Sequence, residues 1–448
     1  MYKIDMPTVP MVVGLILGNM LDMTLFQSLA MGHETWAIFV INPISAVLLV
    51  ISLFSVFAVD SITRIYPIGS IQKSTSKRVK RKGEIPMEMM KGLVSYPSGE
   101  LKLEEVPVPK LGENPYAPHD VLIEVEYCGI CGSDVHRWKG DKTGVKTVSR
   151  KVVAGHEIVG KVEATGKDVT AVRPGDRVVC EIVTFYCGHC PACREGRYNI
   201  CNTISPMEGR AHFVTGGGFA KYTVWPEQQL HKLPDNIPSE EAVLMEPTAG
   251  SIHAIISRMG IKAGESVAIL GPGARGILMA QVCKAIGAGP IIMTGLQRDA
   301  PFRLETAKKI GAADYIINVD TEDLRERIAE ITGGIGVDAV LENSGSVEPI
   351  NESLDIVRKG GKVLWAGGGI RGGIVAPVDT YKIIVKEIDI KGEISQIPYD
   401  WFTAIKFVEA GKVQLKPLVT HVFPLEDWMK GFDLAATSPE ALRVAIKL

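Results

Sequence analysis

The chain has 448 residues, of which 46% are hydrophobic and 22% are charged, and its formal net charge is −2 at pH 7. This length predicts two or three domains, each large enough to bury a hydrophobic core. A net charge so close to zero gives no reason to expect nucleic acid as a partner. The eight cysteines, without a secretory signal pattern, favour a reducing compartment such as the cytoplasm.

The first 65 residues differ from the rest because they carry long apolar runs. Residues 37–59 read AIFVINPISAVLLVISLFSVFAV and contain no charged residue. A helix of this length can cross a hydrocarbon core, which takes about 20 residues, and Pro43 near its start would cap or kink that helix. The sequence therefore predicts a hydrophobic membrane-helix segment over residues 1–65. The alternative is a buried helix of a soluble protein.

Two stretches of this segment, GLILGNMLDMTLFQSL at 14–29 and NPISAVLLV at 42–50, resemble the C-terminal end of the large membrane subunit of tripartite tricarboxylate transporters. The resemblance implies a membrane transport component. A fragment of this size cannot by itself enclose a substrate site between many helices, as transporters do. Transport is therefore the remote alternative for the function of the chain.

A polar, basic linker over residues 66–86 follows the hydrophobic segment. Basic residues just after a membrane span favour the cytoplasmic side. The remaining chain would therefore be anchored to the membrane and face the cytoplasm if residues 1–65 are retained. Met87 stands before KGLVSYPSGELKLEEVPVP, which resembles the start of a separate protein. We interpret residues 1–86 as a fusion or an extended gene model, with the function carried by residues 87–448.

Residues 87–240 contain short runs in which apolar and polar residues alternate, for example VLIEVEY at 121–127. Alternation with a period of two is typical of strands that have one buried face. Glycine and proline separate the runs, as in VRPGDRVV at 172–179. We therefore expect an all-β lobe in this part of the chain.

A compact cysteine motif, CGHCPACREGRYNIC at 187–201, lies within this lobe and has the spacing C-x2-C-x2-C-x7-C. Four thiolates on one short lobe can close a tetrahedron around zinc and leave no open position, which is typical of a structural site. Two disulfides are the alternative, and they would need an oxidising compartment. The predicted ligands are Cys187, Cys190, Cys193 and Cys201.

A second and different metal site is predicted from Cys131 and, 25 residues further on, His156 followed by Glu157. Mixed sulfur, nitrogen and oxygen ligands that leave room for water or substrate are typical of a catalytic zinc. The remaining cysteines lie in apolar runs, where a lone cysteine usually behaves as a small buried hydrophobic residue. They are Cys128, Cys180 and Cys283.

A dinucleotide motif follows at residues 266–288, which read SVAILGPGARGILMAQVCKAIGA. An apolar strand, a glycine turn and a helix succeed one another, and the glycines give G-x-G-x-x-G. Such a turn lets backbone N–H groups and the helix N-terminus approach a pyrophosphate. The predicted cofactor glycines are Gly271, Gly273 and Gly276.

The next predicted strand lacks the acidic residue that usually binds the ribose 2′-hydroxyl of NAD. Gly295 stands at that point, and Asp299 follows four residues later with Arg298 and Arg303 beside it. Nearby arginines permit NADP, whereas Asp299 could reach the ribose of NAD from a longer loop. The sequence leaves NAD and NADP open.

Taken in order, GICGSDVH at 129–136, GHE at 155–157, the four-cysteine lobe and the G-x-G-x-x-G turn resemble the zinc-dependent medium-chain alcohol dehydrogenases. The resemblance covers about residues 87–448 and is nearest to the sorbitol dehydrogenase and L-threonine 3-dehydrogenase branch. It implies a GroES-like β-barrel catalytic domain over 87–240, completed by 389–448, and a Rossmann dinucleotide-binding domain over 241–388. The expected fold is therefore α/β, preceded by a hydrophobic helical segment.

The resemblance also implies roles for particular side chains. Glu246 in LMEPTAG would be a further candidate ligand of the catalytic zinc, beside Cys131, His156 and Glu157. Many alcohol dehydrogenases have a cysteine in place of this carboxylate, and its absence favours the polyol and threonine branch. Ser133 would begin a proton relay, because its hydroxyl is two residues from Cys131. His136 would continue the relay or border the pocket, and Asp134 would orient the ligands.

The expected function is oxidation of a secondary alcohol or polyol by hydride transfer to NAD or NADP, with zinc as Lewis acid. L-threonine 3-dehydrogenase shares every motif quoted and is the nearest alternative. A non-enzymatic member of the fold would not need to keep Cys131, His156 and the glutamates together. The family forms dimers or tetramers, so a homodimer or homotetramer is expected.

Overall fold

The computed structural model describes residues 88–113, 117–140, 151–183, 186–202, 216–367 and 375–448. All of these residues belong to one of two units of the chain, Pro86–Leu448. The predicted hydrophobic segment and the basic linker lie outside the described residues. Within the described ranges, no helix is both long enough and apolar enough to cross a membrane.

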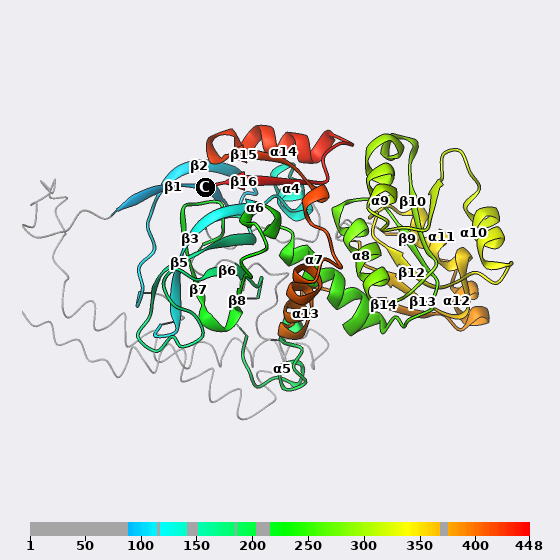
Figure 1. Ribbon diagram of the computed structural model, residues 1–448, viewed down its shortest axis with the longest axis horizontal. Helices are drawn as coiled ribbons and strands as arrows, with labels where there is room; N and C mark the ends of the chain where they lie inside the picture. Colours follow the sequence, from blue (N-terminus) through cyan, green and yellow to red (C-terminus); the bar gives the residue numbers. More distant parts are fainter. Residues whose placement is uncertain (1–87, 114–116, 141–150, 184–185, 203–215, 368–374) are drawn as a thin grey trace, which may run out of the picture. The chain divides into compact units, whose positions relative to one another are not determined.

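Antiparallel strands form the first part of the described chain (Figure 1). The central strand is β3 (Asp120–Gly129), which pairs with β5, β7 and β16. Along β3 the side chains of Val121, Ile123 and Val125 are buried, because alternate residues of a strand point to the same face. The other strands of this sheet are β5 (Glu157–Thr165), β6 (Arg177–Cys180), β7 (Tyr222–Pro226), β8 (Leu230–Lys232), β15 (Val419–Pro424) and β16 (Arg443–Lys447).

The C-terminal strands therefore return to the sheet that begins near residue 120, since β16 pairs with β3 and β15 pairs with β16. Helix α14 (Trp428–Thr437) lies between these two strands in the sequence. A separate three-stranded sheet has the order β2-β1-β4. Its strands are β1 (Met89–Ser95), β2 (Leu101–Pro107) and β4 (Val152–Val153).

The second part is a six-stranded parallel sheet with the order β11-β10-β9-β12-β13-β14 (Figure 1). The order reverses between β9 and β12, and ligands bind at such a reversal, beyond the carboxyl ends of the strands. The strands are β9 (Val267–Leu270), β10 (Ile291–Gly295), β11 (Tyr315–Asn318), β12 (Val337–Glu342), β13 (Val357–Trp365) and β14 (Asp389–Gly392). All four residues of β9 are buried, as expected where helices cover both faces of a parallel sheet.

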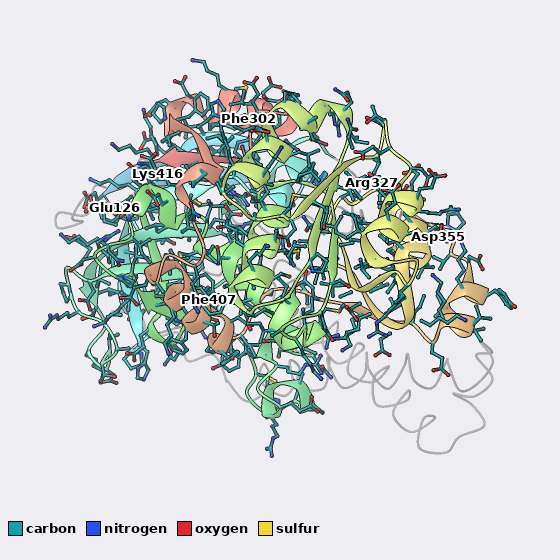
Figure 2. All side chains as sticks on the ribbon, turned by 45° about the vertical axis from the view of Figure 1, so that its right-hand side comes forward. Glu126, Phe302, Arg327, Asp355, Phe407 and Lys416 are labelled. Atoms are coloured by element: carbon teal, nitrogen blue, oxygen red, sulfur yellow. The ribbon has the colours of Figure 1, made fainter. Side chains whose placement is uncertain are left out.

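Helices connect these strands in sequence: α8 (Ala274–Ala285), α9 (Glu305–Lys309), α10 (Leu324–Thr332), α11 (Glu348–Ile356) and α12 (Thr380–Lys386). Ion pairs tie the outer helices together. Asp355 of α11, labelled in Figure 2, pairs with Arg325 of α10 at 2.9 Å and with Lys382 of α12. Each connection is thus a strand, a helix and a parallel strand, which confirms the predicted α/β fold with a Rossmann-type sheet.

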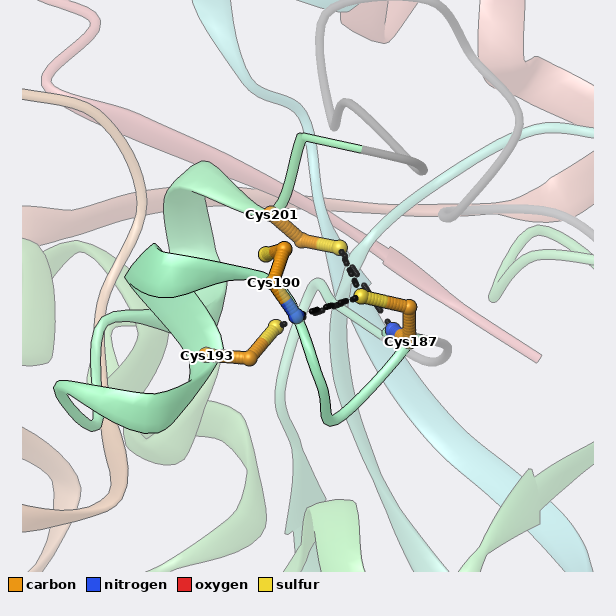
Figure 3. Close-up of side chains that lie close together, drawn as sticks. All are labelled: Cys187, Cys190, Cys193 and Cys201. Carbon is orange, nitrogen blue, oxygen red and sulfur yellow. Dashed lines mark hydrogen bonds between the residues drawn. The ribbon is translucent and has the colours of Figure 1, made fainter.

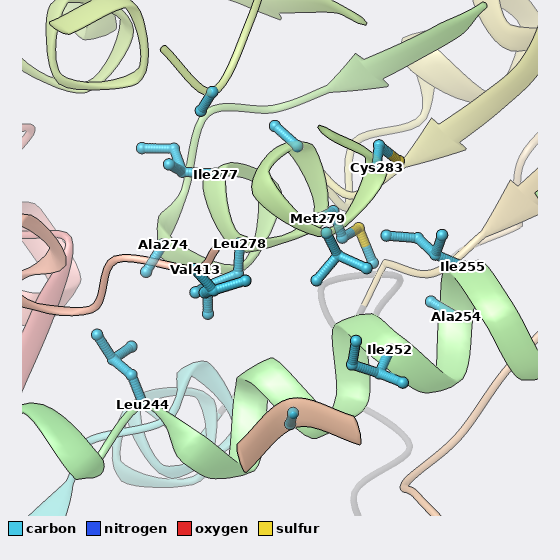
Figure 4. Packing of buried hydrophobic residues seen from close by; sticks show 14 of the residues in the cluster. Leu244, Ile252, Ala254, Ile255, Ala274, Ile277, Leu278, Met279, Cys283 and Val413 are labelled. Atoms are coloured by element: carbon cyan, nitrogen blue, oxygen red, sulfur yellow. The ribbon is translucent and has the colours of Figure 1, made fainter. Parts of the chain in front are cut away.

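Two further helices, α7 (Met245–Ile252) and α13 (Pro398–Glu409), pack against each other. Leu244, Ile252 and Ile255 on α7 and its continuation share one buried cluster with Leu278 and Met279 of α8 (Figure 4). All eight residues of α7 are buried. Glu246 therefore stands on a helix that is fixed by apolar contacts.

Candidate active site and metal centres

Three of the predicted ligands of the catalytic zinc lie together. The ligand atoms of Cys131, His156 and Glu157 are all within 4.8 Å of one another. Cys131 immediately precedes α4 (Gly132–Trp138), and Glu157 is the first residue of β5. Strands β3 and β5 pair so that Gly129 faces Glu157. The strand register therefore brings together two motifs that are distant in the sequence.

Glycines leave the space that this cluster needs. A Cβ atom on Gly129 would lie 2.0 Å from Glu157 Oε2, so no larger residue fits opposite the carboxylate. Gly155 has φ +93°, and its Cβ would lie 2.8 Å from the Phe219 ring. A positive φ is strained for other residues. Gly129 is thus required by the Glu157 carboxylate, and Gly155 by its backbone conformation and the nearby Phe219 ring.

Asp134 lies behind the cluster and is almost fully buried. Its Oδ2 accepts a hydrogen bond from the backbone N–H of Cys131 at 3.1 Å, and its Oδ1 is 3.7 Å from Nδ1 of His156. A carboxylate next to a ligating imidazole fixes the ring orientation. Asp134 thus contacts both the thiol-bearing turn and the imidazole.

The ionisable groups of the cluster act strongly on one another. Burial opposes ionisation of Cys131, but the facing His156 outweighs it and lowers the pKa of the thiol to about 7. Burial also disfavours a charged His156, yet Asp134 and Cys131 raise its pKa to about 10. Burial raises the pKa of Glu157 well above its ordinary value. Both Glu157 oxygens are buried, and Oε1 has the Arg443 guanidinium as its charged neighbour at 3.0 Å. The thiol, imidazole and carboxylate together form a donor set that fits zinc.

The other predicted active-site residues take different positions. Glu246 is the second residue of α7 and is not part of the three-residue ligand set. Instead its Oε1 accepts a hydrogen bond from Gln396 Nε2 at 2.5 Å. Ser133 and His136 lie on α4, and both are half-buried.

The four-cysteine lobe comes together around α5 (Pro191–Arg194) and a 3₁₀ turn, Tyr198–Ile200 (Figure 3). The sulfurs of Cys187, Cys190, Cys193 and Cys201 all lie within 4.8 Å of one another. Cys187 Sγ is 4.0 Å from Cys193 Sγ and 3.6 Å from Cys201 Sγ. Tetrahedral zinc with Zn–S bonds of about 2.3 Å would separate its sulfurs by about 3.8 Å. All four thiols are free, so the geometry fits zinc and not two disulfides.

The dinucleotide turn joins β9 to α8, and each of its three glycines has a different structural role. Gly271 has φ +111°, and a Cβ there would lie 3.1 Å from the backbone of Ser344. A Cβ on Gly276 would lie 2.1 Å from the backbone oxygen of Gly271. Gly273 caps the start of α8, and its Cβ would meet no protein atom within 4 Å. This open side is where a pyrophosphate can approach the backbone.

The residues predicted to select the cofactor separate into two groups. Asp299 is buried, and its Oδ2 accepts a hydrogen bond from Leu296 N–H at 3.1 Å. Arg303 lies 3.5 Å from Asp299 Oδ1 and donates to backbone oxygens of residues 438–441. Gly295 and Arg298 differ: Gly295 ends β10 and Arg298 is exposed on the turn that follows. Asp299 and Arg303 are thus engaged within the protein, while Arg298 faces solvent.

Sequence reasoning missed two residues of the site. Arg443 of β16 places Nη1 3.0 Å from Glu157 Oε1 and donates to the backbone oxygen of Ile130 at 2.6 Å. Its signal was a lone arginine at the start of the apolar run VAI. Gln396, the partner of Glu246, follows the parallel sheet and had no signal in the sequence.

Two sequence profiles of known protein families match the chain, one in the part with the antiparallel strands and one in the part with the parallel sheet. The sequence profile of the alcohol dehydrogenase GroES-like domain matches residues 117–235, and that of the zinc-binding dehydrogenase matches residues 275–410. Neither profile extends into residues 1–86, so the transporter resemblance gains no support from them.

Three curated relatives are similar over most of their length. D-arabitol-phosphate dehydrogenase of Enterococcus avium is 39% identical over 70% of this chain and 86% of its own. Sorbitol dehydrogenase of Halalkalibacterium halodurans is 37% identical over 80% of this chain and 99% of its own. L-threonine 3-dehydrogenase of Anaeromyxobacter sp. is 35% identical over 74% of this chain and 90% of its own.

A solved structure has the same fold. A putative zinc-binding dehydrogenase from Sinorhizobium meliloti 1021, bound to NADP, aligns with a TM-score of 0.71 and 28% identity, covering 81% of this chain and 100% of its own. It combines, in one protein of this fold, a zinc-binding dehydrogenase and a nicotinamide cofactor. With the two profile matches and the curated relatives, the conclusion follows that the chain belongs to the zinc-dependent medium-chain alcohol dehydrogenase family.

Proposed function

We propose that the chain oxidises a secondary alcohol group of a polyol, free or phosphorylated, with NAD(P) as hydride acceptor. The observation that carries this proposal is the buried set of Cys131, His156 and Glu157, whose ligand atoms all lie within 4.8 Å of one another. The named substrates of two relatives, arabitol phosphate and sorbitol, support the polyol class.

We assign the following roles to the residues of this chain. Cys131, His156 and Glu157 would hold the catalytic zinc, and Glu246, outside that set, would be the further carboxylate of the site. When bound, zinc makes the substrate hydroxyl more acidic and the nicotinamide accepts the hydride. Ser133 would receive the hydroxyl proton. His136, one helical turn later on the same face of α4, would pass it towards solvent.

The cofactor turn supports use of NADP as well as NAD. Gly295 leaves no acidic side chain at the end of β10 to repel a 2′-phosphate, and Arg298 is exposed on the next turn. We therefore include Arg298 in the cofactor site. Asp299 and Arg303 shape that turn through their contacts with Leu296 N–H and residues 438–441.

L-threonine is the second candidate substrate, because L-threonine 3-dehydrogenases are among the relatives. Initial rates of the zinc-loaded full chain with NAD and NADP separate the two candidates. The panel contains sorbitol, D-arabitol, D-arabitol phosphate, butane-2,3-diol and L-threonine. A polyol or polyol phosphate that exceeds L-threonine in kcat/KM is expected. A dominant rate with L-threonine would overturn the polyol proposal and leave the zinc site intact.

The proposal also covers the cellular compartment and the oligomeric state. All eight cysteines are free, as is typical of proteins in a reducing compartment, so we propose that residues 87–448 act in the cytoplasm. We also propose that the chain is a homodimer or homotetramer. Whether residues 1–65 anchor it to a membrane depends on the presence of that segment in the mature protein.

A further inference from the structure

Glu246 is held by a neutral side chain beside the ligand set. Gln396 Nε2 donates to Glu246 Oε1 at 2.5 Å and lies 3.3 Å from the backbone oxygen of the same residue. Both side chains are buried, with 8% of Glu246 and 4% of Gln396 exposed. The Glu246 charge acts electrostatically on His156 and Arg443 across the site. The carboxylate is therefore near the ligands but has a partner of its own.

Gln396 lies on a segment, residues 393–400, that is fixed along its length. At the near end Glu393 forms an ion pair with Arg275 of α8 at 2.5 Å. Asn199, from the turn between the third and fourth cysteine of the zinc lobe, donates to the backbone oxygen of Ile394 at 2.8 Å. The segment is thus attached both to the helix of the dinucleotide turn and to the structural lobe.

The far end of the segment is equally fixed. Asp400 accepts a hydrogen bond from Ile397 N–H at 2.9 Å, and its Oδ2 is 2.7 Å from Nδ1 of His253. Ser257 donates to the other oxygen of Asp400 at 2.5 Å. Ser395, directly before Gln396, has φ +55°, a conformation that is strained for a residue other than glycine. The backbone is therefore bent at the residue that directs the amide towards α7.

Helix α7 leaves room for this amide. Gly250 follows Glu246 by one turn, and a Cβ there would lie 3.2 Å from Gln396 Nε2. Packing of α7 against α8 prevents the helix from moving aside (Figure 4). The contact between Gln396 and Glu246 is therefore set by two fixed elements and not by a mobile surface chain.

We propose that Gln396 is a positioning residue that holds Glu246 off the metal. Cys131, His156 and Glu157 then supply three ligands, and one position stays open for the substrate oxygen. An amide suits this task because it donates a hydrogen bond to a carboxylate without carrying charge. Release of Glu246 lets its carboxylate compete with substrate for the open position. The inference rests on the proposed zinc site and deepens it.

The test compares Gln396→Leu with the unchanged full chain after loading with cobalt(II), whose visible absorption reports the ligands. The released Glu246 is expected to change the visible spectrum and to slow metal loss to a chelator, both by entering the coordination shell. The KM for the alcohol should rise by about tenfold, the scale of second-shell effects at metal sites. In a Glu246→Gln background the same substitution should change neither spectrum nor chelator rate.

Two further variants keep the test decisive. Gln281→Leu removes another buried glutamine, whose amide donates to the backbone oxygen of Gln414 at 3.1 Å, and it should leave the cobalt spectrum unchanged. Gly250→Ala crowds the Gln396 amide and should give a smaller change of the same sign if Gln396→Leu does not fold.

The outcomes that contradict the positioning role differ from the outcome that contradicts the proposed function. Cobalt bound with identical spectra, or faster metal loss from Gln396→Leu, overturns the positioning role alone. If the unchanged chain binds no cobalt at Cys131, the proposed function itself fails.

Discussion

At the end of β10, Gly295 takes the place where an NAD site usually has an acidic side chain. A Cβ at Gly295 would lie 2.8 Å from the Pro272 side chain and 3.1 Å from Leu304. The dinucleotide turn and the following helix therefore close over this position. An acidic residue here would have to displace them, which supports the proposal that Arg298 on the next turn contacts the cofactor.

The first prediction concerns Arg298. Arg298→Ala should raise the KM for NADP by about tenfold, because one charge-assisted hydrogen bond of ~1.4 kcal/mol is lost. The KM for NAD should change little, since NAD has no 2′-phosphate. Steady-state rates with both cofactors measure this, and Arg173→Ala, at an exposed arginine in the antiparallel part, is the control. Equal effects on both cofactors would remove Arg298 from the site.

A second prediction concerns Asp338 of β12. Its carboxylate accepts hydrogen bonds from Ser266 N–H at 2.8 Å and Arg358 Nε at 2.7 Å. Burial opposes the charge, but the hydrogen bonds from Arg358 and Ser266 lower the pKa of Asp338 below its ordinary value. A lowered pKa means that the carboxylate stabilises the fold above its unfolded pKa, near 3.9, and that this stabilisation disappears as the pH falls through the folded pKa.

Asp338→Asn should therefore destabilise the chain by about 1–3 kcal/mol at pH 7. The gap in melting midpoint between variant and unchanged chain should narrow as the pH approaches 4 and below. Thermal melting over a pH series measures this, with the exposed Asp235→Asn as control. A gap that does not depend on pH would contradict the role of the charge.

Among the elements, the unit of β9, the glycine turn and α8 contains two glycines with different roles. Gly276 is required by packing within the protein, whereas Gly273 leaves room for the cofactor. Gly276→Ala brings a Cβ to 2.1 Å from Gly271 O and should lower the melting midpoint as well as cofactor affinity, at a cost of about 1–3 kcal/mol for overpacking. Gly273→Ala meets no protein atom within 4 Å, so it should keep the melting midpoint and weaken only cofactor binding. Calorimetry of cofactor binding beside thermal melting tests the pair. Unimpaired binding in Gly273→Ala would show that the pyrophosphate lies elsewhere.

The two predicted metal sites should respond differently to the loss of a cysteine ligand. Cys131→Ser should remove about one zinc per chain and reduce the rate by more than about 100-fold, with little change in melting. Cys190→Ser should also remove about one zinc, but should lower the melting midpoint by roughly 5 °C or more, because a closed thiolate site contributes folding energy. Metal analysis and thermal melting measure both, and Cys283→Ala, at a buried thiol outside both sites, should keep both metals. Loss of both zincs in either variant would contradict two independent sites.

The structural lobe is also tied to the rest of the molecule through two neighbouring side chains. Tyr198 donates to Glu181, and Glu181 lies 2.8 Å from His231 Nε2. Asn199 donates to Ile394 O in the segment that carries Gln396. The lobe is therefore attached to the sheet of β3 and to the segment that carries Gln396.

At the scale of the whole molecule, the far edge of the parallel sheet carries exposed apolar side chains. Tyr381 and Ile384 of α12 are 71% and 72% exposed, and Val375 just before the helix is 88% exposed. Strand β14, which follows α12, is the last strand of that sheet. Large exposed apolar side chains and the edge strands of sheets are typical of interfaces between subunits.

Ile384→Asp should therefore shift the proposed homodimer or homotetramer to a monomer, because a charge would be buried without a partner in the interface. Light scattering coupled to size-exclusion chromatography of the full chain measures the mass. Ile335→Asp places the same charge at an equally exposed isoleucine, at 70%, and should leave the mass unchanged. An unaffected oligomer in Ile384→Asp would place the interface elsewhere.

The sequence by itself determined the fold class, the family and the clusters of ligands that lie close in the chain. Four cysteines within fifteen residues and a glycine turn between a strand and a helix are local patterns, so their chemistry can be read without the fold. Residues 1–65, also read locally, lie outside the described part, and their prediction is untested.

Tertiary structure decided the contacts between distant segments. Arg443 reaches Glu157 only because β16 pairs with β3, and Gln396 reaches Glu246 only because the segment after β14 crosses α7. It also decided that Asp299 and Arg303 bind within the protein while Arg298 stays exposed. Which side chains meet when they are 150 or more residues apart in the sequence depends on strand order and helix packing, and local patterns do not encode these.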